Sequence, residues 1–131
     1  MNNQQVFDKV VAHLNAQGCR SLSATGDCVY LAPNGNMCAV GCLLGDAYKP
    51  EMENMHVETP VVRNVIEQLF PNVSINMLTC LQEAHDRSAT YQQIVQQLDE
   101  IAADHHLTFN PDDINNWYKP MNKIDWSVDI A

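Results

Sequence analysis

The sequence predicts a mainly α (α+β) domain, with five to six helices around a central apolar helix at about 37–46 and a small antiparallel β element. Over most of the chain, apolar residues recur at intervals of three and four, which is typical of helices with one buried face. Residues 37–44 are apolar on every side, so a helix there has no face suited to water and belongs in the centre. Residues 124–130 alternate apolar and polar side chains, which is the period of a strand.

Length and composition indicate a single domain spanning 1–131. Of the 131 residues, 46% are hydrophobic and 18% charged, a mixture that fills one core. No apolar run approaches the ~20 residues that span a bilayer, and the N-terminus lacks the pattern of a secretory signal. The net charge of −9 argues against a nucleic-acid backbone or an anionic membrane as partner. Five cysteines, an odd number without an export signal, favour free thiols and a cytoplasmic location.

The first third of the chain contains one clear helix and then a turn-rich region. A helix is expected at 3–17, followed by Gly18, which stops a helix by adopting the left-handed conformation. Its expected buried stripe consists of Val6, Phe7, Val10, Val11 and Leu14. Residues 28–31 are expected as a short strand between two turns. Asn36 is expected to cap the central helix at 37–46.

Three further helices are expected at 60–70, 75–86 and 91–105, each with apolar residues at helical spacing. Their start signals are Thr59 followed by Pro60, Ser74, and Thr90 or Ser88. A short helical turn is expected from Pro111 to Trp117. The tail, 122–131, is expected to pack on the domain and to pair with 28–31, because an isolated strand is unstable. The aromatic residues Trp117, Tyr118 and Trp126 are expected to fasten the C-terminal region to the domain.

The cysteines and histidines suggest a metal site only weakly. Cys38 and Cys42 share a helix face, and Cys28, His56 and His85 are possible further ligands. A structural zinc site usually presents two ligand pairs, and this chain has one. Because free cysteine is often buried, the sequence favours core cysteines and no metal. Whether Cys28, Cys38 and Cys42 hold a metal stays open at this point.

A catalytic cysteine is a second possibility. Cys38 falls in the first turn of its expected helix, where the dipole can lower a thiol pKa, and His85 is a candidate base. In the structural interpretation, Cys38 instead packs inside, and the ring nitrogens of His85 satisfy backbone groups near the central helix. We expect the structural interpretation, in which Cys38 is not catalytic.

An acidic surface is the third candidate site. Residues 99–131 contain seven acidic residues against two lysines. The candidate binding residues are Asp99, Glu100, Asp104, Asp112 and Asp113. They would suit a basic site on a protein partner, although scattered acids are also typical of an ordinary solvated surface. No phosphate-binding glycine motif is present, so no nucleotide cofactor is expected.

Three stretches, at 28–30, 35–44 and 81–86, resemble a family of small, mostly uncharacterised proteins carried by bacteria and tailed phages. They match its C-x-Y, C-A-x-G-x-L and L-Q-x-x-H-D motifs, and the resemblance covers roughly 3–107. Members often carry tryptophan after the H-D pair, where this chain has Tyr91 instead. The resemblance implies a phage or mobile-element origin and no particular activity.

Together, these observations favour a small intracellular, non-enzymatic binding or accessory protein that acts on a host protein without a cofactor. The alternative is a cysteine-dependent hydrolase that uses Cys38 and His85. The sequence does not decide the identity of the partner or the oligomeric state.

Overall fold

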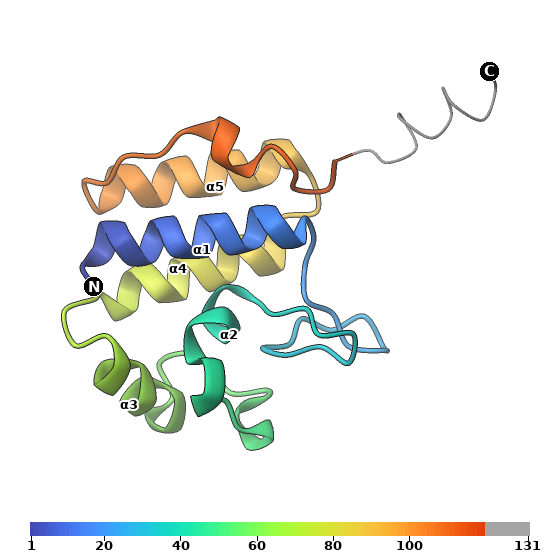
Figure 1. The fold of residues 1–131 in the computed structure, drawn as a ribbon, viewed down its shortest axis with the longest axis vertical. Coiled ribbons are helices and arrows are strands. Elements are labelled where there is room, and N and C mark those ends of the chain that lie inside the picture. Colours follow the sequence, from blue (N-terminus) through green and yellow to red (C-terminus); the bar gives the residue numbers. More distant parts are fainter. Residues whose placement is uncertain (120–131) are drawn as a thin grey trace.

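The computed structural model describes residues 1–119, and within that range the chain is mainly helical (Figure 1). The elements in chain order are α1 (Asn3–Gln17), α2 (Ala39–Leu44), the short 3-10 helices η1 (Gly45–Ala47) and η2 (Pro50–Met52), α3 (Pro60–Leu69), α4 (Ile75–Arg87), α5 (Tyr91–Asp104) and the 3-10 helix η3 (Pro111–Ile114). None of the helices in the described range has both the length and the apolar character needed to span a bilayer.

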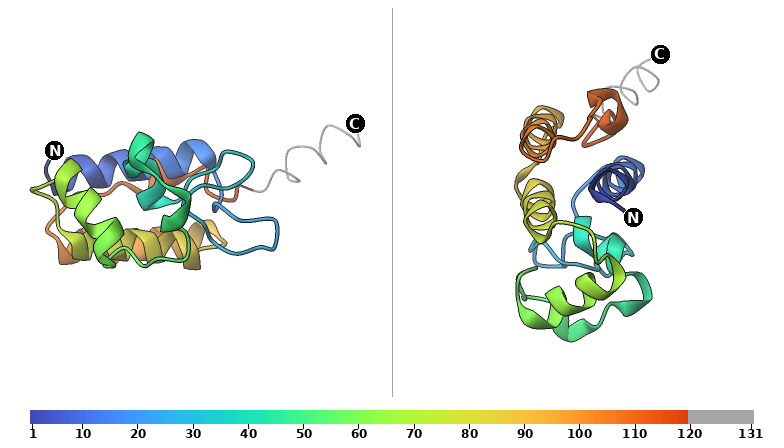
Figure 2. Two further views of the ribbon diagram at one scale, coloured as in Figure 1. Left: turned by 90° about the horizontal axis from the view of Figure 1, so that it is seen from below. Right: turned by 90° about the vertical axis from the view of Figure 1, so that its left-hand side faces the viewer.

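The long helices and η3 form one side of the molecule. The right-hand view of Figure 2 looks along them and places α1, α4, α5 and η3 as four neighbours. Contacts run from α1 to α4, from α4 to α5, from α5 to η3, and from η3 back to α1. The other side consists of α2 and α3, with α2 against both α1 and α4. The segment 105–119 therefore returns across the bundle and reaches the N-terminal helix.

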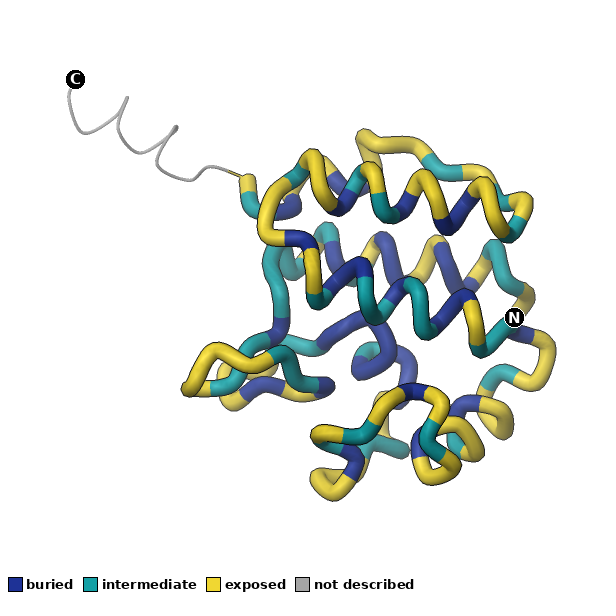
Figure 3. Tube along the Cα trace, turned by 180° about the vertical axis from the view of Figure 1, so that it is seen from behind, coloured by how far each residue is buried: buried dark blue, intermediate teal, exposed yellow. Residues whose placement is uncertain are grey.

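The apolar segment forms the centre of the fold, as the sequence predicts. Five of the six residues of α2 are buried: Ala39, Val40, Gly41, Leu43 and Leu44. Figure 3 shows this helix almost entirely dark blue, whereas the longer helices alternate buried and exposed positions. Such alternation follows from helices that bury one stripe and leave the opposite face in water.

Most helix ends lie where the sequence predicts them. Asn2 and Gln5 form a capping box at the start of α1, and Gly18 ends this helix with φ 76°. The hydroxyl oxygens of Ser74 and Thr90 accept backbone N–H bonds at the starts of α4 and α5. Each cap satisfies a backbone donor that has no partner inside its helix. Trp117 is fully buried, which confirms its expected role in fastening the C-terminal segment.

The central helix is shorter than the predicted range of 37–46. It begins at Ala39 with Cys38 as its cap, rather than at position 37 with Asn36 as the cap. The reason is that the carbonyl of Asn36, which would accept the first intrahelical bond, instead accepts the backbone N–H of Ala32 at 2.8 Å. A short isolated bridge also joins Met37 to Leu31. These contacts hold the chain extended for two more residues before the helix starts.

The predicted β element is not seen within residues 1–119. The expected strand at 28–31 contributes only to two isolated antiparallel bridges, Leu22 with Cys28 and Leu31 with Met37. The side chain of Glu53 takes the place of a neighbouring strand, because its two carboxylate oxygens accept the backbone N–H groups of Tyr30 and Leu31. A ladder therefore cannot extend along this edge. The expected strand at 124–130 and the packing of the tail, 122–131, lie outside the described residues.

A close backbone approach fixes the central helix against the turn-rich region. A Cβ atom built on Gly41 would lie 2.1 Å from the carbonyl oxygen of Tyr30, which is far inside van der Waals contact. The same oxygen accepts the backbone N–H of Cys38 at 3.2 Å. Only glycine fits at position 41 without moving one of these two backbone segments.

Candidate functional site

His85, on the last turn of α4, is fully buried, and both of its ring nitrogens are hydrogen-bonded. The backbone N–H of Ser21 donates to Nε2 at 2.9 Å, so Nε2 carries a lone pair and no proton. The proton of the neutral ring is therefore on Nδ1, which donates to Oδ1 of Asp86 at 2.7 Å. This confirms the expectation that His85 satisfies a backbone group, although the group belongs to Ser21 rather than to the turn before α2.

The network continues from Asp86 to the start of the central helix. Nε2 of Gln82 donates to Oδ1 of Asp86 at 3.0 Å, and Oε1 of Gln82 accepts the backbone N–H of Val40 at 3.1 Å. Val40 lies in the first turn of α2, where backbone donors lack partners inside the helix. The hydrogen bonds thus join α4 to both the segment around Ser21 and α2. Their arrangement is that of a structural junction.

Cys38 is buried beneath this junction and caps α2. Its Sγ accepts the backbone N–H of Gly41 at 3.2 Å. Burial raises the pKa of the Cys38 thiol well above its ordinary value, despite the opposing effect of neighbouring N–H donors. Among residues 1–119, no hydrogen bond joins Cys38 to His85. The two residues of the predicted catalytic pair are thus each held by other partners.

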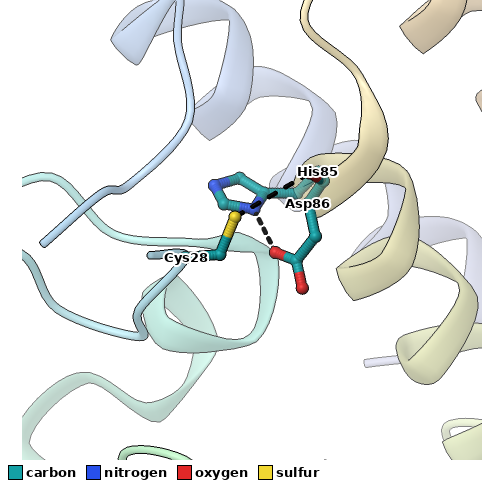
Figure 4. A group of neighbouring side chains, drawn as sticks. All are labelled: Cys28, His85 and Asp86. Carbon is teal, nitrogen blue, oxygen red and sulfur yellow. Dashed lines mark hydrogen bonds and ion pairs between the residues drawn. The ribbon is translucent and has the colours of Figure 1, made fainter. Parts of the chain in front are cut away.

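The candidate metal ligands include one compact group. Within the described range, the Sγ of Cys28, a ring nitrogen of His85 and a carboxylate oxygen of Asp86 lie within 4.8 Å of one another (Figure 4). These donors do not fit a metal ion: a ring whose Nε2 accepts from Ser21 has its proton on Nδ1, the atom that faces the group. Burial also raises the pKa of Cys28 to about 11, which keeps the thiol protonated at neutral pH.

The other sequence candidates for metal binding do not join this group. Sγ of Cys42 donates to the carbonyl of Ala39 at 3.1 Å, and burial raises the pKa of this thiol to about 12. His56 is exposed, and its Nδ1 accepts the backbone N–H of Glu58. Cys38 and Cys42 are one helical turn apart in sequence, but their sulfur atoms bond to different parts of the backbone of α2.

The five predicted acidic residues are all exposed and occupy two elements. Asp99, Glu100 and Asp104 lie on α5, and Asp112 and Asp113 lie on η3. The two aspartates of η3 line a groove of about 660 Å³ between α1 and residues 108–113. We call this the α1–η3 groove. Two of the five predicted acidic residues, Asp112 and Asp113, therefore lie at a surface groove.

The α1–η3 groove combines an apolar floor with an acidic rim. Phe7 and Phe109 form its aromatic part, with ring centroids 5.9 Å apart in an edge-to-face arrangement. The charged residues of the lining are Asp8, Asp112 and Asp113, with no lysine or arginine among them. The sequence prediction missed Asp8, because only the return of the chain across α1 brings it near η3.

Hydrogen bonds fasten the two sides of the groove near both ends. At one end, Gln4 exchanges hydrogen bonds with the backbone of Thr108 at 2.8 and 3.0 Å. At the other end, Asn15 accepts from the backbone N–H and the side chain of Asn116, both at 2.9 Å. We call these pairs the Gln4 and Asn15 clasps. They hold the returning segment against α1 on either side of the groove.

Comparison of the chain with protein-family models, with curated proteins and with solved structures finds no match. The likeness to phage and bacterial proteins stays an expectation from sequence motifs. A functional proposal for this chain therefore depends on the chemistry of its own side chains.

Proposed function

We propose that this protein is a non-enzymatic binding protein that contacts a basic segment of a protein partner through the α1–η3 groove. The observation that carries this proposal is the acidic rim of Asp8, Asp112 and Asp113 over an aromatic floor, without a cation in the lining. Complementary charge steers a basic partner to such a surface, and apolar contact then holds it. A phage or mobile-element origin and a host protein as partner are predictions from the sequence resemblance.

The hydrogen bonds of the junction argue against the alternative, a cysteine hydrolase. A general base needs a free lone pair, and the Nε2 lone pair of His85 accepts the Ser21 N–H. A nucleophilic cysteine needs a lowered pKa, whereas burial raises the pKa of Cys38. The hydrolase remains a hypothesis, and fast alkylation of Cys38 in the folded protein at neutral pH would support it.

Capture of proteins from a bacterial lysate tests the proposal when it is done with matched charge variants. The double variant Asp112→Asn/Asp113→Asn removes two groove charges, and Asp99→Asn/Glu100→Gln removes two exposed charges from α5, outside the groove lining. We expect Asp112→Asn/Asp113→Asn to capture less of the basic partners than wild type does. The α5 variant, Asp99→Asn/Glu100→Gln, should capture as much as wild type. Binding should also weaken as salt rises, because exposed charges are screened over about 10 Å at 0.1 M. Equal retention by both double variants would contradict the groove as the contact.

A further inference from the structure

We infer that the occupant of the α1–η3 groove is a short extended peptide segment of about five residues, with one apolar side chain between two cationic ones. This inference rests on the proposed function and specifies the form of the partner. It follows from three features of the groove, namely its length, the absence of a common meeting point for its three carboxylates, and the residues of its floor.

The clasps set the length of the groove. Gln4 and Asn15 are eleven positions apart on α1, which corresponds to about 16 Å along a helix axis at 1.5 Å per residue. An extended chain rises about 3.3 Å per residue, so about five residues fit between the clasps. A helical partner needs a trough that accepts a cylinder roughly 10 Å wide along its whole length. The clasped groove, with a volume of about 660 Å³, suits the extended form.

The carboxylates of the rim do not converge on one point. Across residues 1–119, the only group of three metal-type ligands within 4.8 Å of one another is Cys28, His85 and Asp86. Asp8, from α1, and the two aspartates of η3 therefore do not form a cage for a single ion. Separate cationic groups spaced along one chain, such as lysine or arginine side chains, match them better.

The floor offers a place for one apolar side chain. Phe109 is half-buried beside the fully buried Phe7, and the wall on α1 is low because Ala12 and Ala16 are small and exposed. An apolar side chain seated here would cover the exposed part of Phe109. Aromatic and aliphatic anchors in the middle of a polar rim are the usual arrangement of a peptide site.

The test measures binding of dye-labelled, capped hexapeptides by fluorescence polarisation at low salt. The first peptide has a leucine with one lysine on each side of it. In the second peptide glycine replaces the leucine, and in the third glutamine replaces both lysines. We expect the first to bind, the second to bind roughly tenfold more weakly because it lacks the apolar anchor, and the third not to bind. Ala12→Leu should fill the groove and abolish binding of the first peptide. Its matched control is Ala103→Leu, at an exposed position of α5, which should bind normally.

The outcomes separate this inference from the proposed function. One outcome is that the two lysine peptides bind equally, that Ala12→Leu has no effect on binding, and that Asp112→Asn/Asp113→Asn weakens the binding of both peptides. The acidic residues of the groove then bind cations as proposed, and the inference of an apolar anchor is wrong. Tighter binding by a twelve-residue helical peptide with the same charges would also overturn the extended form. If neither lysine peptide binds, or if binding is unaffected by Asp112→Asn/Asp113→Asn, the inference fails together with the groove as a binding site. Circular dichroism of each variant verifies that a loss of binding is not a loss of fold.

Discussion

Replacing Gly41 by alanine should destabilise the protein, although alanine is the better helix former. The new Cβ would lie 2.1 Å from the carbonyl oxygen of Tyr30, and ordinary contact begins at 3.4 Å, so the two backbones must separate by about 1.3 Å. Overpacking costs about 1–3 kcal/mol, and the strained hydrogen bond from Cys38 to this oxygen costs about 1 kcal/mol more. The gain in helix propensity is about 1 kcal/mol. The free energy of unfolding should therefore fall by about 1–3 kcal/mol.

Urea denaturation followed by circular dichroism measures this change, and the melting temperature should drop by roughly 3–12 °C for a domain of this size. Gly26→Ala is the matched control, because Gly26 has φ 88° and a Cβ atom added there would meet nothing within 4 Å. The control reports only the cost of a left-handed alanine, about 1 kcal/mol. A Gly41→Ala protein as stable as wild type would refute the proposed contact between α2 and the Tyr30 backbone.

Three further perturbations probe other parts of the fold. His85→Ala should lower the free energy of unfolding by about 3–5 kcal/mol, because it opens a cavity and leaves the buried Ser21 N–H without an acceptor; a urea midpoint within error of wild type would contradict this. Trp117→Phe should cost about 1–2 kcal/mol in the same assay, since the carbonyl of Ser88 loses its indole donor, and no change would show that this bond contributes nothing. Stability should also fall as pH rises above about 9: burial raises the pKa values of Cys28 and Cys42 from 9.0 to about 11 and about 12, so the unfolded chain releases these protons first. A urea midpoint that is flat between pH 8 and 10.5 would show that these thiols ionise alike in both states.

Local signals predicted the long helices well. The α1 stripe, the stop at Gly18 and the caps at Ser74 and Thr90 each depend on residues within one turn of the position that they determine. The apolar spacing expected for the helix at 60–70 is buried only in part, since Val61 and Leu69 of α3 remain 44% exposed. Its main packing partner among the described α-helices is α2, which covers part of its apolar face.

Long-range hydrogen bonds explain what local patterns missed. The start of α2 depends on Ser21 and Ala32, which both donate to the carbonyl of Asn36. The absent strand depends on Glu53, which lies more than twenty positions from the groups that it bonds. The same holds for the sites. The acidic character of Asp112 and Asp113 was visible in the sequence, whereas their proximity to Asp8 required the fold. His85 was recognised as a candidate, but its role depends on Ser21, which carries no sequence signal.

The clasps have a consequence for how the protein is made. They join residues that are 104 and 101 positions apart, so the two walls of the α1–η3 groove come from opposite ends of the described chain. During synthesis, α1 leaves the ribosome well before the segment after α5, so Phe7 lacks its contact with Phe109 until that segment has emerged. A chain that stops near residue 104 would lack one wall and one aromatic ring of the site. The groove is therefore completed only after α5 has been made, and a chain that stops before then would present an apolar helix face in its place.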